Sequence, residues 1–474
     1  MIIGREKEQQ DLLRLLEQDE PQFCVVYGRR RVGKTFLVRE TFANNFTFQH
    51  TGLANASKSD QLREFRESLR AAGMKHPKTP KTWFEAFGLL QEHLASLPVG
   101  KKVIFIDELS WLDTPKSNFV SALEHFWNGW ATARNEKDIV LIVCGSATSW
   151  LINKIVRNRG GLHNRLTMKI YLQPFTLEEC QQYAEHLRLE FSKRDLLETY
   201  MIMGGVPYYW SFLRKGMSLA QNIDRLFFNI DAPLSDEYDA LYASLFRNPA
   251  PHIAIITALA KKNSGMLRKE ILAATHADDN TTFSQALQEL EQCNFIRRYM
   301  AFGKKERDMV YQLMDNYTLF YFRFIAENHH HDENYWSHSF DTPQHAVWAG
   351  LAFERVCLWH LPQMKRALGI DGVITSAQSW RTKATDEHPG AQIDLLIDRN
   401  DNIINLCEMK FSDAEYAITQ QENSKLQSRK EIFKMETGTR KPVHLTMVTT
   451  YGVQHNAYWN NVQSEITMED FFRQ

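Results

Sequence analysis

The sequence predicts a multidomain α/β protein whose first part is a doubly wound, parallel sheet. Short apolar runs, which are typical of buried strands, alternate with amphipathic helical patterns as far as about residue 175. The pattern is then helical, and after residue 336 helices and strands both occur again. A chain of 474 residues exceeds the usual size of one hydrophobic core, so we expect about three domains.

Composition limits the class of protein further. Apolar residues make up 43% of the chain and aromatic residues 12%, as in a well-packed globular protein. No apolar stretch approaches the roughly 20 residues that cross a bilayer, and the first ten residues are too charged for a signal peptide, so we expect a cytoplasmic protein without a membrane partner. The six cysteines form no Cys-x-x-Cys pair, which predicts free thiols and no structural zinc. A net charge of −1 means that any nucleic-acid surface must be a local patch.

The most informative motif is the octet GRRRVGKT at residues 28–35. It follows an apolar run and leads into an amphipathic stretch, which is the order strand, glycine-rich loop, helix. In such a loop the backbone N–H groups point at nucleotide phosphates, Lys34 reaches the β and γ phosphates, and the Thr35 hydroxyl completes the shell of Mg²⁺. A β-carbon at Gly28 or Gly33 would block the phosphate. We therefore predict a P-loop nucleotide site with these contacts: Gly28, Arg29, Arg30, Arg31, Val32, Gly33, Lys34, Thr35 and Phe36.

The apolar run that ends in Asp107 and Glu108 predicts a second part of the same site. A buried parallel strand delivers such carboxylates to its C-terminal tip. We expect Asp107 to hold Mg²⁺ through water and Glu108 to polarise the water that attacks the γ-phosphate. An isolated Asp-Glu pair often caps the next helix instead, but the octet upstream favours the catalytic interpretation.

Two later residues are further candidates for the nucleotide site. Ser146 ends the apolar run at 138–146, where a small polar residue can sense the γ-phosphate; the alternative is that it caps the following helix. Arg165 precedes another strand pattern and could reach a phosphate in its own or a neighbouring subunit; the alternative is an ion-paired surface arginine.

Four motifs together carry a family resemblance. The octet, the strand that ends in Asp-Glu, the Cys-Gly-Ser strand tip and the Gly-Gly-Val-Pro element at 204–207 occur in that order. On these motifs the chain resembles the archaeal-type ATPases of the STAND branch of the AAA-related P-loop proteins. The resemblance implies that the nucleotide is ATP and that Pro207 lies over it on a helical lid. We expect an ATPase domain at 1–175 and the lid at 176–245, which starts with a capping box of Thr176 and Glu179.

Residues 246–328 predict a winged helix. Three helical patterns are followed by two short strand patterns around the charged turn GKKER. The hairpin carries five cations and one acid, so non-specific contact with DNA phosphates is expected; the alternative is that the hairpin packs against neighbouring domains. The charged residues are Arg297, Arg298, Lys304, Lys305, Glu306 and Arg307.

The C-terminal part, residues 329–474, holds a second candidate active site. A helical pattern presents Glu354, an alternating strand carries Asp394, and the next strand carries Glu408 and Lys410. Because strand side chains alternate, Glu408 and Lys410 share a face, and Asp394 on the paired strand is expected opposite them. Two carboxylates and an ammonium would suit metal-assisted phosphodiester hydrolysis, with Asp394 and Glu408 on Mg²⁺. The alternative is an exposed Glu-Lys pair beside an unrelated aspartate.

The order Glu, Asp, Glu-x-Lys resembles the PD-(D/E)xK nuclease superfamily, over about 140 residues. Ile393 stands where the superfamily's name has proline. A later helix offers Gln420, Gln421, Lys425 and Arg429 at helical spacing. The resemblance implies a C-terminal fold of the restriction-endonuclease type. The histidines at 329–331 are expected to be a solvated linker.

These observations predict an ATPase coupled to a metal-dependent, nuclease-like domain that acts on DNA. The alternative is a nucleotide-dependent switch that binds DNA or a protein without cleaving it. A third possibility is a motor or loader that works as a ring, which would be a homo-oligomer.

Overall fold

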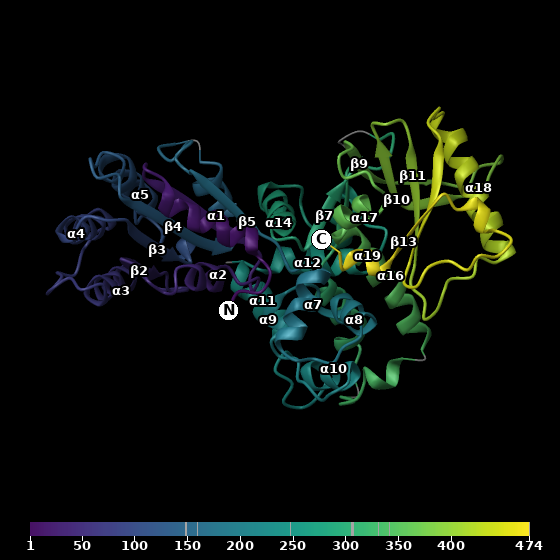
Figure 1. Cartoon of the computed structure of the whole chain (residues 1–474), viewed down its shortest axis with the longest axis horizontal. Helices are drawn as coiled ribbons and strands as arrows, with labels where there is room; N and C mark the ends of the chain where they lie inside the picture. The colour runs from purple at the N-terminus through teal and green to yellow at the C-terminus, as the bar shows by residue number, and fades with distance from the viewer. Residues whose placement is uncertain are drawn as a thin grey trace. The chain divides into compact units, whose positions relative to one another are not determined.

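The computed structural model (Figure 1) divides into two compact units, Met1–Pro174 and Phe175–Gln474. The structure does not describe every residue of the predicted motifs. Outside the described residues lie Lys305, Glu306 and Arg307 of the charged turn, and His330 of the histidine run. The described ranges are 1–146, 149–158, 160–246, 248–304, 308–329, 331–340 and 342–473.

The first unit is built on a five-stranded sheet in the order β2-β3-β4-β1-β5. Every neighbouring pair is parallel, which confirms the predicted parallel sheet. Its three central strands, β1, β3 and β4, are almost fully buried, as expected for a sheet with helices on both faces. The strands are β1 (Gln22–Gly28), β2 (Phe48–Thr51), β3 (Lys102–Asp107), β4 (Ile139–Ser146) and β5 (Met168–Leu172).

Alternate residues of β1 belong to two separate cores, one on each face of this sheet. Phe23 and Val25 pack with α3, α4 and α5, whereas Cys24 and Val26 pack with α1 and α2. Ser57 and Thr82 cap α3 and α4 through their hydroxyl groups. The helices are α1 (Glu6–Glu17), α2 (Lys34–Thr41), α3 (Lys58–Ala71), α4 (Trp83–Ser96), α5 (Phe119–Phe126) and α6 (Ser149–Leu151).

The second unit begins with a helical region. The predicted capping box is present, because the Thr176 hydroxyl accepts a hydrogen bond from the Glu179 N–H and the Glu179 carboxylate accepts one from the Thr176 N–H. The helices are α7 (Leu177–His186), α8 (Lys193–Met203), α9 (Pro207–Trp210), α10 (Leu219–Phe227) and α11 (Glu237–Leu245).

Three helices and a small antiparallel sheet follow, in the order that the sequence predicts. The sheet order is β6-β8-β7, so the β7–β8 hairpin gains a third, very short strand. The elements are α12 (Ala250–Ala260), β6 (Met266–Leu267), α13 (Arg268–Thr275), α14 (Thr281–Gln292), β7 (Ile296–Tyr299) and β8 (Val310–Leu313).

The C-terminal region contains a mixed sheet in the order β13-β12-β11-β10-β9. The predicted β10–β11 hairpin is present, with Leu395 paired to Cys407, whereas β11, β12 and β13 are mutually parallel. The elements are α15 (Asn316–Phe320), α16 (Pro343–Trp359), α17 (Leu361–Ala367), β9 (Thr375–Thr382), β10 (Ala391–Arg399), β11 (Ile404–Lys410), α18 (Gln420–Thr437), β12 (Val443–Thr449), β13 (Ser464–Thr467) and α19 (Met468–Phe471).

One continuous apolar core runs through the second unit, from Phe175 to Phe472. Aromatic rings join its parts: Phe320 contacts Trp336 and Trp348, with ring centroids 5.2 and 5.9 Å apart. The opposite face of the C-terminal sheet packs against α18 in a separate core. No described helix is both long enough and apolar enough to cross a membrane.

His360, buried at the end of α16, makes the stability of the second unit depend on pH. Its Nδ1–H donates to the Val356 carbonyl, 2.8 Å away, and its Nε2 accepts from the Leu177 N–H at 3.0 Å. Burial lowers the pKa of His360 to about 4. The unfolded state therefore binds more protons between pH 6.5 and 4, so stability falls as the pH falls through that window.

We expect the His360→Gln variant to lose this pH dependence. Between pH 7 and 5 the free energy of unfolding of the wild type should fall by about 2 kcal/mol more than that of the variant, because Gln accepts the Leu177 hydrogen bond without titrating. Urea unfolding of both proteins at the two pH values measures the difference. Equal losses in both proteins would contradict a neutral, buried His360.

Candidate functional site

The loop at residues 28–35 connects β1 to α2 at the C-terminal edge of the first sheet. A β-carbon at Gly28 would lie 2.2 Å from the carbonyl oxygen of Leu172 on β5. The close approach of β5 therefore requires glycine here, in addition to the predicted approach of phosphate. Gly33 has a φ of +89°, a conformation that a glycine adopts without strain.

Lys34 is buried in this loop and its ammonium is held in place. Its Nζ donates to the carbonyl oxygens of Gly28 and Arg29, at 3.3 and 2.8 Å. Val32 is buried in the core beside α2, so it contributes backbone rather than side chain to the loop, whereas the Phe36 ring is 52% exposed. The loop thus presents a fixed positive charge among backbone N–H groups, as phosphate binding requires.

Asp107 and Thr35 form the oxygen-rich side of the site. The Thr35 hydroxyl donates to the Asp107 carboxylate at 2.8 Å, and the Glu108 N–H donates to the other carboxylate oxygen at 2.9 Å. A hydroxyl and a carboxylate within one hydrogen bond of each other are the hard oxygen donors that Mg²⁺ prefers. The residues present therefore fit Mg²⁺ at the place that the sequence predicts.

Glu108 lies beside this pair with a shifted pKa. Burial raises the pKa of its carboxyl, and the Asp107 charge raises it further, while Lys34 and Arg30 act in the opposite direction. A carboxylate that is a stronger base than usual is suited to polarise an attacking water. The predicted residues Lys34, Thr35, Asp107 and Glu108 thus occupy one site.

Ser146 lies at the tip of β4, beside Gly28 of β1 in the sheet register. Its position at the loop agrees with a γ-phosphate contact, and that role stays a prediction. Arg165 is exposed, and no ion pair joins it to another residue in the described ranges. Its role as a phosphate contact also stays a prediction.

Pro207 is the first residue of α9 in the second unit. The glycines before it are explained by packing: a β-carbon at Gly205 would lie 1.9 Å from the Phe175 carbonyl oxygen, and the Trp210 indole N–H donates to the Gly204 carbonyl at 2.7 Å. These contacts fix the start of α9. A contact between Pro207 and nucleotide stays a prediction.

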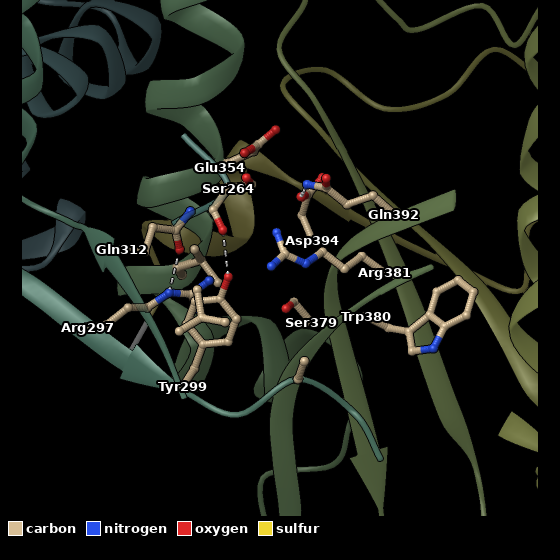
Figure 2. Close-up of a pocket in the computed structure, with 13 residues that line it drawn as sticks. Ser264, Arg297, Tyr299, Gln312, Glu354, Ser379, Trp380, Arg381, Gln392 and Asp394 are labelled. Carbon is tan, nitrogen blue, oxygen red and sulfur yellow. Dashed lines mark hydrogen bonds between the residues drawn. The ribbon is translucent and has the colours of Figure 1, made fainter. Parts of the chain in front are cut away.

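A second candidate site is a cavity of about 20 Å³ in the second unit, shown in Figure 2. Glu354 of α16 and Asp394 of β10 both line it. An irregularity in β10 explains why both carboxyl groups line one cavity. Ile393 and Leu396 both pack on the α18 side of the sheet, although strict alternation would place them on opposite sides. Such a bulge re-aims the intervening side chains, and so brings Asp394 to the face of Glu354.

Glu354 has a strongly shifted pKa in this cavity. Burial, and after it the Asp394 charge, raise the pKa of the Glu354 carboxyl to about 7. Two carboxyl groups in a small cavity repel each other when both are ionised. They would gain stability from a bound proton or cation.

Glu408 and Lys410 do not line this cavity. Leu406 packs on the α18 side, and strand alternation places Glu408 and Lys410 on that same side. The Glu408 carboxylate forms ion pairs with Lys410 at 2.9 Å and with Arg429 at 2.5 Å. The expectation that Asp394 would lie opposite them on one face is therefore wrong in detail, and the bulge in β10 is the reason. Of the polar residues predicted on the later helix, Arg429 is the one that contacts Glu408.

A metal would need a rearrangement at this second site. Glu354 and Asp394 supply carboxylate oxygens, but Glu408 is already neutralised by two cations. Within the described ranges no group of three or more His, Cys, Asp or Glu side chains is placed to hold a metal ion. The donor chemistry fits Mg²⁺, and the third carboxylate must first leave its partners.

The β7–β8 hairpin differs from the predicted basic surface. Arg297 and Tyr299 face the cavity rather than solvent, and burial lowers the pKa of Arg297 to about 10. Arg298 points the other way and pairs with Glu291 at 3.4 Å, and Lys304 is exposed. The prediction of a phosphate contact is thus wrong for Arg297. Strand alternation, which separates Arg297 from Arg298, was the signal in the sequence that could have shown it.

The parallel sheet, the glycine-rich loop and the Lys34, Thr35 and Asp107 constellation define a P-loop ATPase domain. Comparison with known families agrees: residues 2–212 match the ATPase domain found predominantly in Archaea. This part of the chain is therefore similar to the archaeal-type ATPase domains.

Individual proteins align with a longer part of this chain, at sequence identities of 25% or less. An uncharacterised protein of Methanocaldococcus jannaschii is 25% identical over 418 residues, which cover 87% of this chain and 88% of that protein. A Walker-type ATPase of Pyrococcus abyssi aligns with a TM-score of 0.49 and 17% identity, over 67% of this chain and 95% of that one. The ORC2 protein of Aeropyrum pernix, solved as ADPNP and ADP complexes, aligns with a TM-score of 0.40 and 13% identity, over 66% and 90%. These two structural similarities assign no function.

Proposed function

We propose that this protein couples ATP hydrolysis to Mg²⁺-dependent cleavage of DNA by its C-terminal region. The observation that carries the nuclease assignment is the meeting of Glu354 and Asp394 in one cavity, with Glu408 and Lys410 on the adjoining strand. The order α16, α17, β9, β10, β11, α18, β12 supports a restriction-endonuclease-like fold. The role in DNA cleavage rests on this chemistry, not on the relatives.

In the ATPase site each residue has a distinct task. Lys34 would neutralise the β and γ phosphates, Thr35 and Asp107 would hold Mg²⁺, and Glu108 would orient and polarise the attacking water. Bound Mg²⁺ would supply charge neutralisation at the phosphates. Ser146, Arg165 and Pro207 are proposed as further contacts, with Arg165 reaching its own or a neighbouring subunit's nucleotide.

In the nuclease-like site the carboxylates would hold Mg²⁺ and the ammonium would stabilise charge. We propose Asp394 and Glu408 as the metal-binding pair, Glu354 as an outer carboxylate that orients water, and Lys410 as the cation at the scissile phosphate. Bound Mg²⁺ would supply Lewis acidity at that phosphate. Asp394 and Glu408 lie on different faces of the sheet here, so joint binding of Mg²⁺ would require Asp394 to turn towards Glu408 and Glu408 to give up its contacts with Lys410 and Arg429. The arrangement described would then be a resting one.

A nucleotide-dependent switch that binds DNA or protein without cleavage is the second candidate. The specific observation that favours it is the double ion pair of Glu408, which neutralises a required metal-binding residue. A cavity of about 20 Å³ beside Glu354 and Asp394 also gives no room for a phosphodiester as it stands.

Incubation of the full-length protein with DNA separates the two candidates. We expect nicking or degradation of single- or double-stranded DNA with Mg²⁺, loss of that activity with EDTA, and a change in rate when ATP is added. If DNA stays intact under every combination of ATP, Mg²⁺ and Mn²⁺, and DNA binding depends on ATP, the nuclease proposal is wrong and the switch is the better candidate.

The elements between residues 250 and 313 are proposed to form a winged helix that contacts DNA phosphates. With Arg297 turned inward, Arg298 and Lys304 are the described hairpin cations that remain at the surface. We expect the double variant Arg298→Ala, Lys304→Ala to bind all DNA sequences more weakly, and to lower the slope of log affinity against log salt by about 2.

Fluorescence anisotropy at several salt concentrations measures this slope. Lys365→Ala, Arg366→Ala on α17 is the matched control, since it removes the same charge from another surface of the second unit. If the slope of log affinity against log salt is the same for both double variants and the wild type, the hairpin does not contact DNA phosphates and only packs against its neighbours.

A further inference from the structure

The β7–β8 hairpin forms one wall of the carboxylate cavity. Arg297 and Tyr299 of β7 and Gln312 of β8 line the same space as Glu354 and Asp394, and Figure 2 shows these side chains gathered around it. Residues more than 40 positions apart in the sequence thus line the space beside the carboxylates. The wall comes from outside the C-terminal sheet.

The end of the hairpin docks onto the edge strand of the C-terminal sheet. Ala301 forms a parallel bridge with Ser379 of β9, and the Phe302 N–H donates to the Ser379 carbonyl at 2.7 Å. The Phe302 ring lies against the Phe433 ring of α18, with centroids 5.2 Å apart. The hairpin therefore adds a piece of strand to an edge that would otherwise be free.

The side chains of the wall are fixed by hydrogen bonds. The Arg297 Nε–H donates to the Gln312 side-chain oxygen at 2.7 Å, and the guanidinium lies 4.3 Å from the centre of the Tyr299 ring. The Tyr299 hydroxyl donates to the Ser264 carbonyl at 3.1 Å. A positive charge is thus held in the wall that faces two carboxyl groups, where it lowers the cost of burying them.

The space beside the carboxylates is too small for a substrate. A cavity of about 20 Å³ has room for little more than one water molecule. A phosphodiester and its neighbouring sugars need far more space, so they enter this cavity only when a wall moves, although the Glu354 side chain is itself 23% exposed. β7 and β8 reach the apolar core through Ile296 and Leu313, as α16 and β10 also do, but the end of the hairpin at Ala301 and Phe302 is held by a strand bridge and a ring contact.

We propose that the β7–β8 hairpin is an internal cover that closes the carboxylate cavity, and that its release from β9 opens the site. The proposal rests on the proposed nuclease function for its biological meaning. The closure itself is a property of the second unit and is testable without any cleavage.

The test uses the accessibility of a cysteine introduced at Ser379, which lines the cavity. All six native cysteines are buried, so the background reaction with a thiol reagent is low. In the full-length protein we expect Ser379→Cys to react slowly with 5,5′-dithiobis(2-nitrobenzoic acid), and about tenfold faster when Phe302→Ala loosens the hairpin. Ser376→Cys on the same strand is exposed and should react quickly with or without Phe302→Ala.

A milder variant and a second measurement keep the result interpretable. Phe302→Leu retains an apolar side chain and should give an intermediate labelling rate, and thermal unfolding shows whether the variants remain folded. In parallel, Mg²⁺-dependent DNA cleavage is compared between the wild type and Phe302→Ala without the added cysteine. We expect the variant to cleave several-fold faster.

The outcomes separate the cover from the nuclease. Equal labelling of Ser379→Cys and Ser376→Cys, with the hairpin intact, would overturn the cover. Cleavage by the wild type that Phe302→Ala does not accelerate would also overturn it, because the hairpin would then not limit access. Faster labelling in Phe302→Ala with no cleavage by either protein would support the cover and refute the nuclease.

Discussion

Replacing Lys34 by alanine is expected to reduce ATP turnover by at least about 100-fold. Lys34 carries a full positive charge in a buried position, and its ammonium is fixed by the carbonyl oxygens of Gly28 and Arg29. In the complex that charge would face the β and γ phosphates, where charge develops during transfer. Steady-state phosphate release measures the loss of turnover, and nucleotide affinity measured with the same preparation shows separately how much ATP binding is lost.

Two further variants define the role of the site. Glu108→Gln keeps the size of the side chain but cannot polarise water as well, so we expect ATP to stay bound while turnover falls. Lys7→Ala removes an exposed lysine on α1 and serves as the matched control, with unchanged turnover. Normal turnover in both Lys34→Ala and Glu108→Gln would show that ATP is hydrolysed elsewhere.

The second large effect is expected at the C-terminal site. Asp394→Ala, Glu408→Ala and Lys410→Ala should each reduce Mg²⁺-dependent DNA cleavage to below about one hundredth, and leave ATP turnover intact. The carboxylates act as a unit, so the loss of either one should cost almost as much as the loss of both. Glu354→Gln should be milder, because an outer carboxylate that orients water is partly replaced by an amide.

Asp401→Ala is the control for these variants. Asp401 lies in the turn between β10 and β11 and pairs with Arg399, so its removal changes the same hairpin without touching the cavity. Gel analysis of plasmid nicking, with ATP turnover measured in parallel, reports both activities. Cleavage that survives Asp394→Ala and Glu408→Ala together would belong to another site or to a contaminant.

The ATPase site was predictable from the sequence because its parts are local. Lys34 and Thr35 are placed by one loop, and Asp107 by the end of one buried strand, so a parallel sheet brings them together with little freedom. Of the residues predicted for a C-terminal site, Glu354 and Asp394 line one cavity, whereas Glu408 and Lys410 do not. A single irregularity in β10 turns Asp394 away from Glu408, and no alternating pattern in the sequence reports such a bulge.

The docking of the β7–β8 hairpin was not predictable for a different reason. It depends on contacts between residues far apart in the chain, such as Ala301 with Ser379 and Phe302 with Phe433. The charges of the hairpin suggested an outward-facing surface, and the inward direction of Arg297 follows from tertiary packing that overrides this composition.

The continuous core from Phe175 to Phe472 limits how this protein can be cut into pieces. A fragment that ends before residue 336 would lack Trp336 and Trp348, and the ring of Phe320 would lose both of these contacts. Such a truncation would expose a large apolar surface and would favour aggregation. We therefore expect residues 175–473 to fold as one piece, although the sequence alone suggests three separable modules. Fragments for expression and exchanges of domains should keep this range whole.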